Sequence, residues 1–284
     1  MKDFFTQNLK RIRRIPLGRS PNDKLKLLGI AALQSIPQKI RDHSNTINTQ
    51  IEQTTKQACN GLTIQTNNIN YKVLDRESLE IVCPDFETFM HPYFTPKKDQ
   101  IILDVGANVG KYTLQAAIKV GNHGKVIAIE ADNQNYKTLQ QSIKLNQLNN
   151  ILLLNIAAYN KECRLKFYIG DTTARHSLKS NQNHGFHIVT AKPLDQVLTE
   201  NNITKIDWIK IDVEGAEYET LLGLQKTLEN NKPKIIIEVF SANIPKVKTL
   251  LINKGYQITE IAQFGIPDDY CAYFCCCKRK NNRP

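Results

Sequence analysis

The sequence has no uninterrupted apolar run of about 18 residues, which is the length that a helix needs to cross a bilayer. The apolar run from Leu27 to Leu33 spans only seven residues, lies late for a secretory signal and is followed by no cleavage site of the A-x-A type. We therefore expect residues 24–35 to form a helix that docks on the body of the protein, and we expect a cytoplasmic location.

Paired C-x-x-C motifs are also absent, although the chain has seven cysteines. Their odd number and irregular spacing argue against a structural zinc site and against a disulfide framework, so a reducing interior is the better expectation. Four of them lie in "CAYFCCC", residues 271–277. Alternating residues of a terminal strand explain this cluster more simply than lipidation beside the basic residues that follow it.

The body of the chain has no excess of positive charge, because the net charge of +11 arises at the two ends. Residues 1–41 carry ten Lys or Arg against two Asp, and the last seven residues add four more basic side chains, which leaves −1 for residues 42–277. A nucleic-acid enzyme more often carries a basic stripe on the body itself. We therefore expect no nucleic-acid partner.

Residues 1–60 are rich in basic and polar side chains, and we expect them to form a partly helical extension of a main domain at residues 61–284. Four residues in it recur at helical spacing with basic residues between them: Phe5, Leu9, Ile12 and Pro16. This pattern predicts a short basic amphipathic helix. A solvated or weakly docked helix is the simpler interpretation, and peripheral contact with a membrane surface is the alternative.

From residue 100 onward, short apolar β-rich runs alternate with helical patterns, which is typical of parallel strands with helices on both faces. The predicted strands are 101–105, 126–130, 151–155, 208–212, 235–239, 257–261 and 272–276. The predicted helices are 110–120, 134–147, 194–201, 216–230 and 244–253. Before them, "LTIQTNNINYKVL" predicts a hairpin around Asn67 and Asn68. The short connection between the last two strands favours an antiparallel hairpin at the sheet edge.

Residues 162–190 interrupt the alternation with two short strand-like pieces, "RLKFYI" and "HIVTAK", around a long polar loop. An insertion of this length beside a site often carries substrate contacts. We therefore expect this segment to help shape the binding site for a substrate.

The stretch "ILDVGANVGKYT", residues 102–113, has the form of a ligand-binding loop but fits neither common phosphate motif. A P-loop needs one more residue between Gly106 and Gly110, and Tyr112 stands where Ser or Thr should bind magnesium. The dinucleotide motif G-x-G-x-x-G fails because Asn108 and Lys111 replace its second and third glycines.

The acids around this loop favour S-adenosylmethionine as the ligand. The carboxylate of Asp104 ends its strand, where it would repel a phosphate but attract a cation, and the cofactor carries an ammonium and a sulfonium. Gly106 and Gly110 would allow close approach of the backbone. Glu130 ends the next strand, 24 residues beyond Gly106, where an acid can accept both ribose hydroxyls.

The stretch "IDWIKIDVEGAE", residues 206–217, supplies the candidate chemical groups. Lys210 lies on one face of a covered strand, where it needs a carboxylate partner, either as a structural ion pair or in a functional role. Asp212 ends the strand and Glu214 begins the following turn. If the ligand donates its methyl group, the acceptor needs a base to take its proton, so Asp212, Glu214 and His176 are the candidates for that role, with Lys210 beside them.

Four stretches of the chain together resemble the FkbM family of S-adenosylmethionine-dependent methyltransferases. They are "ILDVGANVGKYTLQAA", "VIAIEADNQNYKTLQQSIKLN", "KPLDQVLTE" and "IDWIKIDVEGAEYETLLG…IIIEVF". The resemblance covers about residues 85–278. It implies an α/β fold of the Rossmann-like class I methyltransferase type, with seven mostly parallel strands, and O-methylation of a hydroxyl, often on a sugar or natural product.

Two further positions match the family: Glu87 in "DFETFM", and His176, Ser177 and Leu178 as its HSL element. The candidate cofactor-binding residues are Glu87, Asp104, Gly106, Ala107, Asn108, Gly110, Glu130, Ala131, Ala157 and Asp212. The expected partner is a small-molecule or glycan hydroxyl acceptor.

Asp212 and Glu238 end strands 26 residues apart and could converge, as in O-methyltransferases that bind magnesium. Val239 stands where those enzymes supply a further oxygen ligand, so we expect no required metal. Two other functions stay open. A nucleic-acid methyltransferase is disfavoured by the neutral body and by "DVEG" in place of an Asn/Asp-Pro-Pro-Tyr motif. A catalytically inactive cofactor-binding module is disfavoured by the acids at 104, 130 and 212.

Overall fold

The computed structural model of the chain describes residues 12–36, 45–170, 177–178, 185–266 and 269–278. The chain divides into two compact units. One comprises residues 1–86 with 137–147, and the other comprises residues 87–136 with 148–284. The domain boundary expected at residue 60 stays a prediction.

In the first unit, helix α2 (Pro21–Gln34) packs against helix α4 (Asn45–Cys59). Helix α2 begins at a capping box, in which Ser20 and Asp23 exchange side-chain and backbone hydrogen bonds. Its buried side chains are Leu27, Ile30, Ala31 and Gln34. The helix predicted at residues 24–35 is therefore confirmed, and its docking on the body of the protein stays a prediction.

A hairpin follows these two helices in the chain, with strands β1 (Thr63–Thr66) and β2 (Ile69–Lys72) paired antiparallel. Asn67 and Asn68 both have positive φ values, 50° and 62°, as the two central residues of a tight hairpin turn of type I′ require. The predicted hairpin is confirmed, and helix α5 (Arg76–Ile81) follows it.

The N-terminal basic helix predicted at residues 5–16 lies mostly outside the described residues. The described part begins at Ile12 and includes a short 3-10 helix, η1 (Ile15–Leu17). Among the described residues, no helix is long and apolar enough to cross a membrane. Contact of the N-terminus with a membrane surface stays a prediction.

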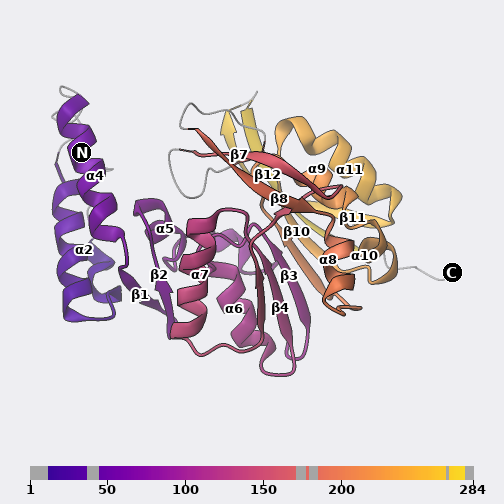
Figure 1. The fold of residues 1–284 in the computed structure, drawn as a ribbon, viewed down its shortest axis with the longest axis horizontal. Coiled ribbons are helices and arrows are strands. Elements are labelled where there is room, and N and C mark those ends of the chain that lie inside the picture. Colours follow the sequence, from indigo (N-terminus) through magenta and orange to yellow (C-terminus); the bar gives the residue numbers. More distant parts are fainter. Residues whose placement is uncertain (1–11, 37–44, 171–176, 179–184, 267–268, 279–284) are drawn as a thin grey trace. The chain divides into compact units, whose positions relative to one another are not determined.

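The second unit is built on a seven-stranded sheet of order β11-β12-β10-β9-β3-β4-β5. Its strands are β3 (Ile101–Val105), β4 (Lys125–Ile129), β5 (Ile151–Leu154), β9 (Trp208–Ile211), β10 (Lys234–Phe240), β11 (Tyr256–Ile266) and β12 (Asp269–Lys278). Strand β12 pairs antiparallel with both β10 and β11, and the other pairings are parallel. The predicted seven-stranded, mostly parallel sheet with an antiparallel edge hairpin is confirmed (Figure 1).

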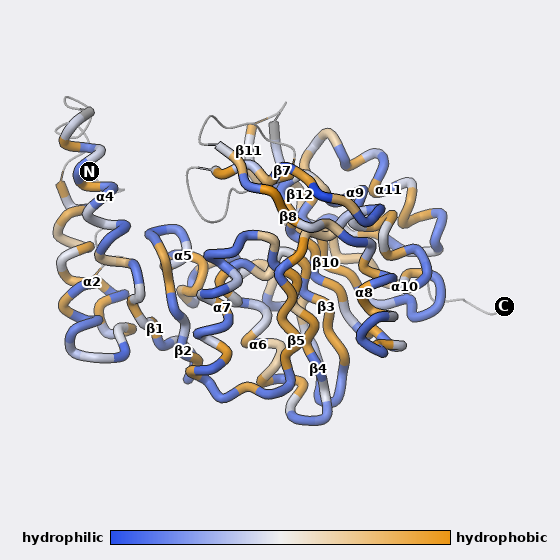
Figure 2. Tube along the Cα trace, viewed as in Figure 1, coloured by the Kyte–Doolittle hydropathy of each residue, from blue (hydrophilic) through white to orange (hydrophobic). Residues whose placement is uncertain are grey.

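Helices cover both faces of this sheet because its strands are apolar on both sides. Figure 2 shows apolar residues concentrated along the strands and hydrophilic residues along the connecting loops. The helices that cover it are α6 (Lys111–Val120), α8 (Leu194–Glu200), α9 (Glu217–Leu222), α10 (Gln225–Asn230) and α11 (Ile244–Asn253). Helix α7 (Asn133–Leu145) begins in this unit and belongs from residue 137 onward to the first unit. One apolar cluster joins the sheet to α8, α9, α10 and α11, and another joins its opposite face to α6 and to Met90 and Phe94.

The single helix predicted at residues 216–230 is wrong, because the structure has two helices there, α9 and α10. The break falls at Gly223 and Leu224. A Cβ atom on Gly223 would lie 2.3 Å from the carbonyl oxygen of Tyr159, so only glycine permits this approach. The helix ends because of a tertiary contact that its own sequence periodicity does not encode.

The insertion at residues 162–190 forms most of a three-stranded sheet of order β6-β8-β7. Its strands are β6 (Ala157–Ala158), β7 (Cys163–Tyr168) and β8 (Phe186–Lys192). The two strand-like pieces predicted in the insertion are therefore confirmed. We call this the small sheet.

Candidate active site

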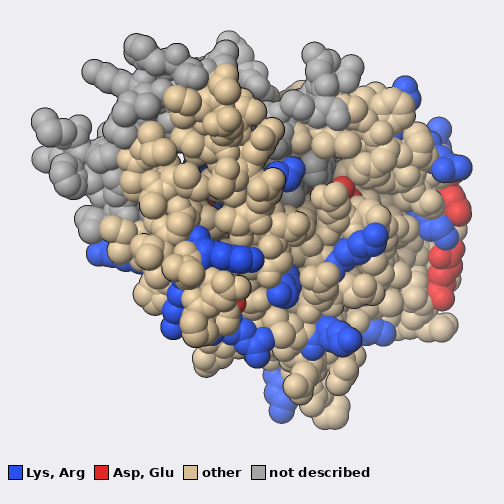
Figure 3. All heavy atoms as spheres, turned by 60° about the vertical axis from the view of Figure 1, so that its left-hand side comes forward, with Lys and Arg blue, Asp and Glu red and all other residues tan. Residues whose placement is uncertain are grey.

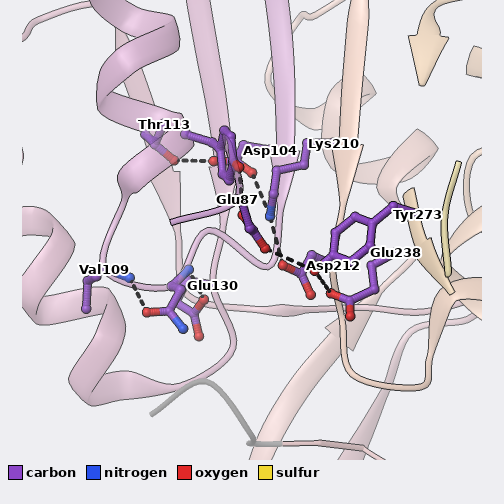
Figure 4. A network of polar contacts seen from close by, with 11 residues as sticks. Glu87, Asp104, Val109, Thr113, Glu130, Lys210, Asp212, Glu238 and Tyr273 are labelled. Carbon is purple, nitrogen blue, oxygen red and sulfur yellow. Dashed lines mark hydrogen bonds and ion pairs between the residues drawn. The ribbon is translucent and has the colours of Figure 1, made fainter. Parts of the chain in front are cut away.

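The carboxyl ends of β3, β9 and β10 bring a buried lysine into contact with carboxylates (Figure 4). Lys210 is the direct neighbour of Asp104 across β9 and β3. Its Nζ lies 3.9 Å from Asp104 Oδ1 and 3.2 Å from Asp212 Oδ2. Lys210 therefore has the carboxylate partner that its covered position predicts, and the observed partners are Asp104 and Asp212.

Electrostatics keeps Lys210 charged in this site. Burial by itself favours the neutral amine, but the carboxylates of Asp212, Asp104 and Glu87 together raise the pKa of Lys210 above its ordinary value. The ammonium also lies 5.1 Å from the ring centroid of Tyr112, at cation–π distance. Lys210 thus supplies a fixed positive charge between two acidic strand ends.

Asp104 is almost fully buried and is held from two sides. Its Oδ2 accepts a hydrogen bond from the hydroxyl of Thr113 on α6, and its Oδ1 faces Lys210. Burial raises the pKa of Asp104, and Lys210 and Thr113 oppose that rise. Its observed partners are therefore protein groups, and direct contact with the cofactor stays a prediction.

Two tyrosines bond to Glu87, and one of them, Tyr273, also bonds to Glu238. The Tyr112 hydroxyl lies 2.6 Å from Glu87 Oε2, and the Tyr273 hydroxyl lies 3.0 Å from Glu87 Oε1 and 2.8 Å from Glu238 Oε2. A phenol has one hydrogen, so Tyr273 cannot donate to both carboxylates at once. Burial, followed by the charges of Asp212 and Glu214, raises the pKa of Glu238 well above its ordinary value. A protonated Glu238 would donate to Tyr273, which would donate to Glu87.

Asp212, Glu214 and Glu238 each offer a carboxylate oxygen, and these three atoms all lie within 4.8 Å of one another. Like charges at this spacing need relief, which a shared proton or a divalent cation would provide. Glu214 is held in the left-handed region, with φ 51°, next to Gly215. The expectation that no metal is required stays a prediction.

Glu130 follows β4 and is the second predicted cofactor acid. Its Oε2 accepts from the backbone N–H of Asn108 at 2.7 Å, and its Oε1 accepts from the N–H of Asp132 at 2.8 Å. Burial raises the pKa of Glu130 to about 7, although both N–H groups oppose that rise. A carboxylate has about four acceptor positions, so two remain for further donors. This capacity fits the pair of hydroxyls on a ribose.

The glycine loop brings the ends of β3 and β9 together. Gly106 has φ +78°, and a Cβ on it would lie 1.7 Å from the carbonyl oxygen of Asp212. Gly110 has φ +95° and forms the N-cap of α6. The N–H groups of Gly106 and Ala107 both donate to the carbonyl oxygen of Ile129 at the end of β4. The loop therefore joins three strand ends around one point, as a site for an adenosyl cofactor requires.

Ala157 belongs to an apolar cluster of the small sheet, and Ala131 packs against the same cluster. Asn155 holds this region by donating from Nδ2 to the carbonyl oxygens of Glu130 and Ala131. Both alanines therefore lie next to the end of β4 that carries Glu130. Their contact with a cofactor stays a prediction.

His176 lies outside the described residues, so its proposed role as a base stays a prediction. Its neighbour Ser177 is described and bridges two parts of the unit. The Ser177 backbone pairs with Tyr168 on β7, and its hydroxyl donates to the carbonyl oxygen of Glu214. The small sheet is therefore bonded directly to the turn that carries the candidate acids.

The residues of this arrangement that were not predicted include Tyr112, Tyr273 and Asn155. Tyr112 occurs in the glycine-loop motif, but nothing in the motif indicates a bond to Glu87, 25 positions earlier. Tyr273 reaches Glu238 only through the antiparallel register of β12 on β10. Asn155 follows directly after β5, and its position at a strand end was the one available signal.

The order of the sheet, with one antiparallel strand near its edge and a glycine loop after β3, defines a Rossmann-like class I methyltransferase, an enzyme that uses S-adenosylmethionine. The model of the FkbM methyltransferase domain matches residues 104–264, and the chain belongs to this family.

Curated relatives are methyltransferases as well. Methyltransferase 1 of Beauveria bassiana is 26% identical over 204 residues, which cover 64% of this chain and 82% of that protein. The hexuronic acid methyltransferase AglP of Haloferax volcanii is 22% identical over 174 residues, covering 61% of this chain and 70% of that protein. An FkbM methyltransferase structure from Methylobacillus flagellatus aligns with a TM-score of 0.46 at 17% identity, over 94% of this chain and 59% of that one.

Proposed function

We propose that this enzyme transfers the methyl group of S-adenosylmethionine to a hydroxyl of a sugar, a glycan or a small natural product. The observation that carries the proposal is the position of Asp212. Its side chain is 26% exposed, Lys210 holds its Oδ2, and Glu238 and Glu214 lie beside it. A partly exposed carboxylate at a strand end is suited to take the proton of an acceptor hydroxyl.

Each side chain then has a distinct part in the proposed reaction. Asp212 accepts the hydroxyl proton while the acceptor oxygen attacks. Lys210 holds the Asp212 carboxylate in place through its Oδ2, and Asp104 balances the charge of Lys210. Tyr273 and Glu87 keep Glu238 in position beside Asp212. The base therefore has a fixed orientation before the acceptor arrives, which proton transfer and methyl transfer both require.

S-adenosylmethionine supplies an electrophilic methyl group on a sulfonium. The residues that fit it are Glu130 for the ribose hydroxyls, the loop around Gly106 and Gly110 for close backbone approach, and Ala131 and Ala157 for the nucleoside. Glu87 and Asp212 provide negative charge for its cationic end. These assignments rest on the unused acceptor capacity of Glu130 and on the convergence of three strand ends at Gly106.

The acceptor class is supported by the FkbM family and by the relative that methylates a hexuronic acid. The net charge of −1 over residues 42–277 also supports a small acceptor over a nucleic acid. Figure 3 shows one face of the described chain, on which Lys and Arg side chains lie in separate groups among other residues.

The test is an incubation of the purified enzyme with S-adenosylmethionine and a panel of acceptors: glucuronic acid, galacturonic acid, and their methyl glycosides. Release of S-adenosylhomocysteine and a mass gain of one CH₂ in the acceptor are the expected results. Mild alkali then separates the two possible products, because it cleaves a methyl ester but leaves a methyl ether intact. An alkali-stable product supports O-methylation of a hydroxyl.

Two results would contradict the proposal. A product that alkali cleaves would show that the enzyme methylates the carboxyl group. Tight binding of the cofactor with no turnover on the sugars or on a wider set of hydroxylated natural products would favour an inactive module. The variant Asp212→Asn is the matched control for background hydrolysis of the cofactor, since it removes the proposed base and adds no bulk.

A further inference from the structure

The inner face of the small sheet covers the strand ends that carry the predicted nucleoside site. Ala157, Phe167, Val189 and Ala191 form one apolar cluster, and Ala131 packs against it. Ala131 directly follows Glu130, whose carboxylate has capacity for ribose hydroxyls. The small sheet is therefore placed to form a wall beside a nucleoside bound at Glu130.

His187 lies on this same inner face. Alternate residues of β8 point to opposite sides, and Val189 and Ala191 are buried while Ile188 and Thr190 are exposed. His187 is two residues before Val189 and four before Ala191, so it lies on the same face of β8. The centroid of its ring lies 5.3 Å from the ring centroid of Phe167. The imidazole therefore points toward the end of β4.

One ring nitrogen of His187 has no hydrogen-bond partner in the part of the chain that the structure describes. His187 Nε2 is buried, and the nearest acidic atom, Asp132 Oδ2, is 3.8 Å away, which is too far for a hydrogen bond. The other oxygen of Asp132 already accepts from the N–H groups of Gln134 and Asn135 at 2.8 Å each. The side chain as a whole is 35% exposed, so a ligand can approach the ring, and a hydrogen bond to the unpaired nitrogen would favour its binding.

The surroundings of this nitrogen suit an adenosine. The N–H of Asp132 donates to Glu130 Oε1. Asp132 therefore lies between His187 and Glu130, the predicted ribose acceptor. Asn155 fixes the carbonyl groups of Glu130 and Ala131. The alanine methyl groups at 131 and 157 are apolar, and a purine with its ribose offers a flat face together with both donors and acceptors.

We propose that His187 is a cofactor-binding residue, whose ring nitrogen bonds the adenosine part of S-adenosylmethionine, so that the small sheet forms one wall of the nucleoside pocket. The proposal rests on the assignment of the enzyme as a methyltransferase and is independent of its acceptor. It also gives the insertion at residues 162–190 a role at the cofactor, in addition to any role at the acceptor.

Calorimetric binding of S-adenosylhomocysteine to the full-length protein tests this proposal. His187→Ala is expected to weaken binding about tenfold, as for the loss of one net hydrogen bond. His187→Gln retains donor and acceptor atoms and should recover part of the affinity. Thr190→Ala, on the outward side of the same strand, is the matched control and should bind as the wild type does. Methylthioadenosine, which lacks the amino-acid end, should show the same loss as S-adenosylhomocysteine.

Wild-type affinity in His187→Ala for both ligands would overturn the proposal, and so would a loss for S-adenosylhomocysteine that methylthioadenosine does not share. Should the alanine variant unfold, the wild-type protein provides the answer. The imidazole C–H signals of His187, assigned by comparison with His187→Gln, should shift on titration with methylthioadenosine, and unchanged signals would also overturn it. Failure of all cofactor binding in the wild type would instead contradict the methyltransferase assignment.

Discussion

Lys210 and Asp104 are direct neighbours on β9 and β3, and Lys210 Nζ lies 3.9 Å from Asp104 Oδ1. Both side chains are buried, with exposures of 6% and 1%. Asp212 holds the same ammonium at 3.2 Å from the outer side. This alignment places a positive charge inside the sheet, which the two carboxylates stabilise.

Replacement of Lys210 by Met is therefore expected to destabilise the protein by about 3–5 kcal/mol, because it leaves Asp104 without a counter-charge. Urea unfolding at neutral pH measures the change. Lys205→Met is the matched control: its amine pairs with Asp207 at 2.8 Å but is 64% exposed, so its loss should cost less than about 1 kcal/mol. The double variant Lys210→Met with Asp104→Asn should regain part of the loss. Equal costs for Lys210→Met and Lys205→Met would contradict a buried pair.

The fold could be predicted from the sequence because its information is local. Strands covered on both faces are apolar almost throughout, and they alternate with helices of amphipathic pattern. The break between α9 and α10 could not be predicted, since it depends on the approach of Gly223 to Tyr159, 64 positions earlier in the chain.

The site was predictable in the same measure. Asp104, Lys210 and Asp212 could be grouped because carboxyl ends of parallel strands meet at one edge, and residues two apart share a face. Tyr273 could not, because its contact with Glu238 depends on the register of an antiparallel strand that carries no motif. His187 could not be predicted either, because no short motif indicates how β8 pairs with β7.

Gly106→Ala is expected to lower the free energy of unfolding by more than the strain of placing alanine at a positive φ would cause by itself. Its added Cβ would lie 1.7 Å from the carbonyl oxygen of Asp212, so β9 or the loop must move. Gly255→Ala is a matched control, since Gly255 has φ +81° and nothing within 4 Å of its Cβ position. That control isolates the strain of positive φ, roughly 1–2 kcal/mol.

Thermal unfolding and S-adenosylhomocysteine binding, measured on both glycine variants, separate the two effects. Gly106→Ala should lose stability beyond Gly255→Ala and should also lose cofactor affinity, while Gly255→Ala should bind normally. The close approach would have no energetic importance if both variants lost the same stability and kept the same affinity.

Glu130 makes stability depend on pH. Its folded-state pKa of about 7 is above its ordinary value of 4.5, so the folded state binds the proton more tightly than the unfolded state. The group therefore lowers the free energy of unfolding progressively as the pH rises from about 4.5 to 7, by about 3 kcal/mol in all. Glu130→Gln removes this dependence. Urea unfolding should show the variant gaining stability relative to the wild type between pH 5 and pH 8, on the order of a few kcal/mol.

Nucleoside binding should have the opposite pH dependence at the same residue. Ribose hydroxyls donate to the ionised carboxylate, so a bound nucleoside lowers the pKa of Glu130 and its binding releases a proton. Methylthioadenosine affinity is expected to rise with pH up to about 7 in the wild type. Calorimetry in buffers of different ionisation enthalpy counts the released proton. A pH-independent affinity in the wild type would contradict the assignment of Glu130 to the ribose.

Asp212→Asn is expected to reduce turnover by at least about 100-fold, the usual contribution of a positioned general base, while cofactor affinity falls far less. The amide keeps the size of the side chain and can still bond Lys210 through its oxygen, but it cannot accept the hydroxyl proton. The rate at saturating S-adenosylmethionine and the Kd for S-adenosylhomocysteine are measured on the same preparations. Glu229→Gln, at an acid that is 58% exposed, controls for loss of one negative charge. Equal loss of turnover and affinity in Asp212→Asn would show that Asp212 holds the site together and that the base is another residue, with Glu214 the next to test.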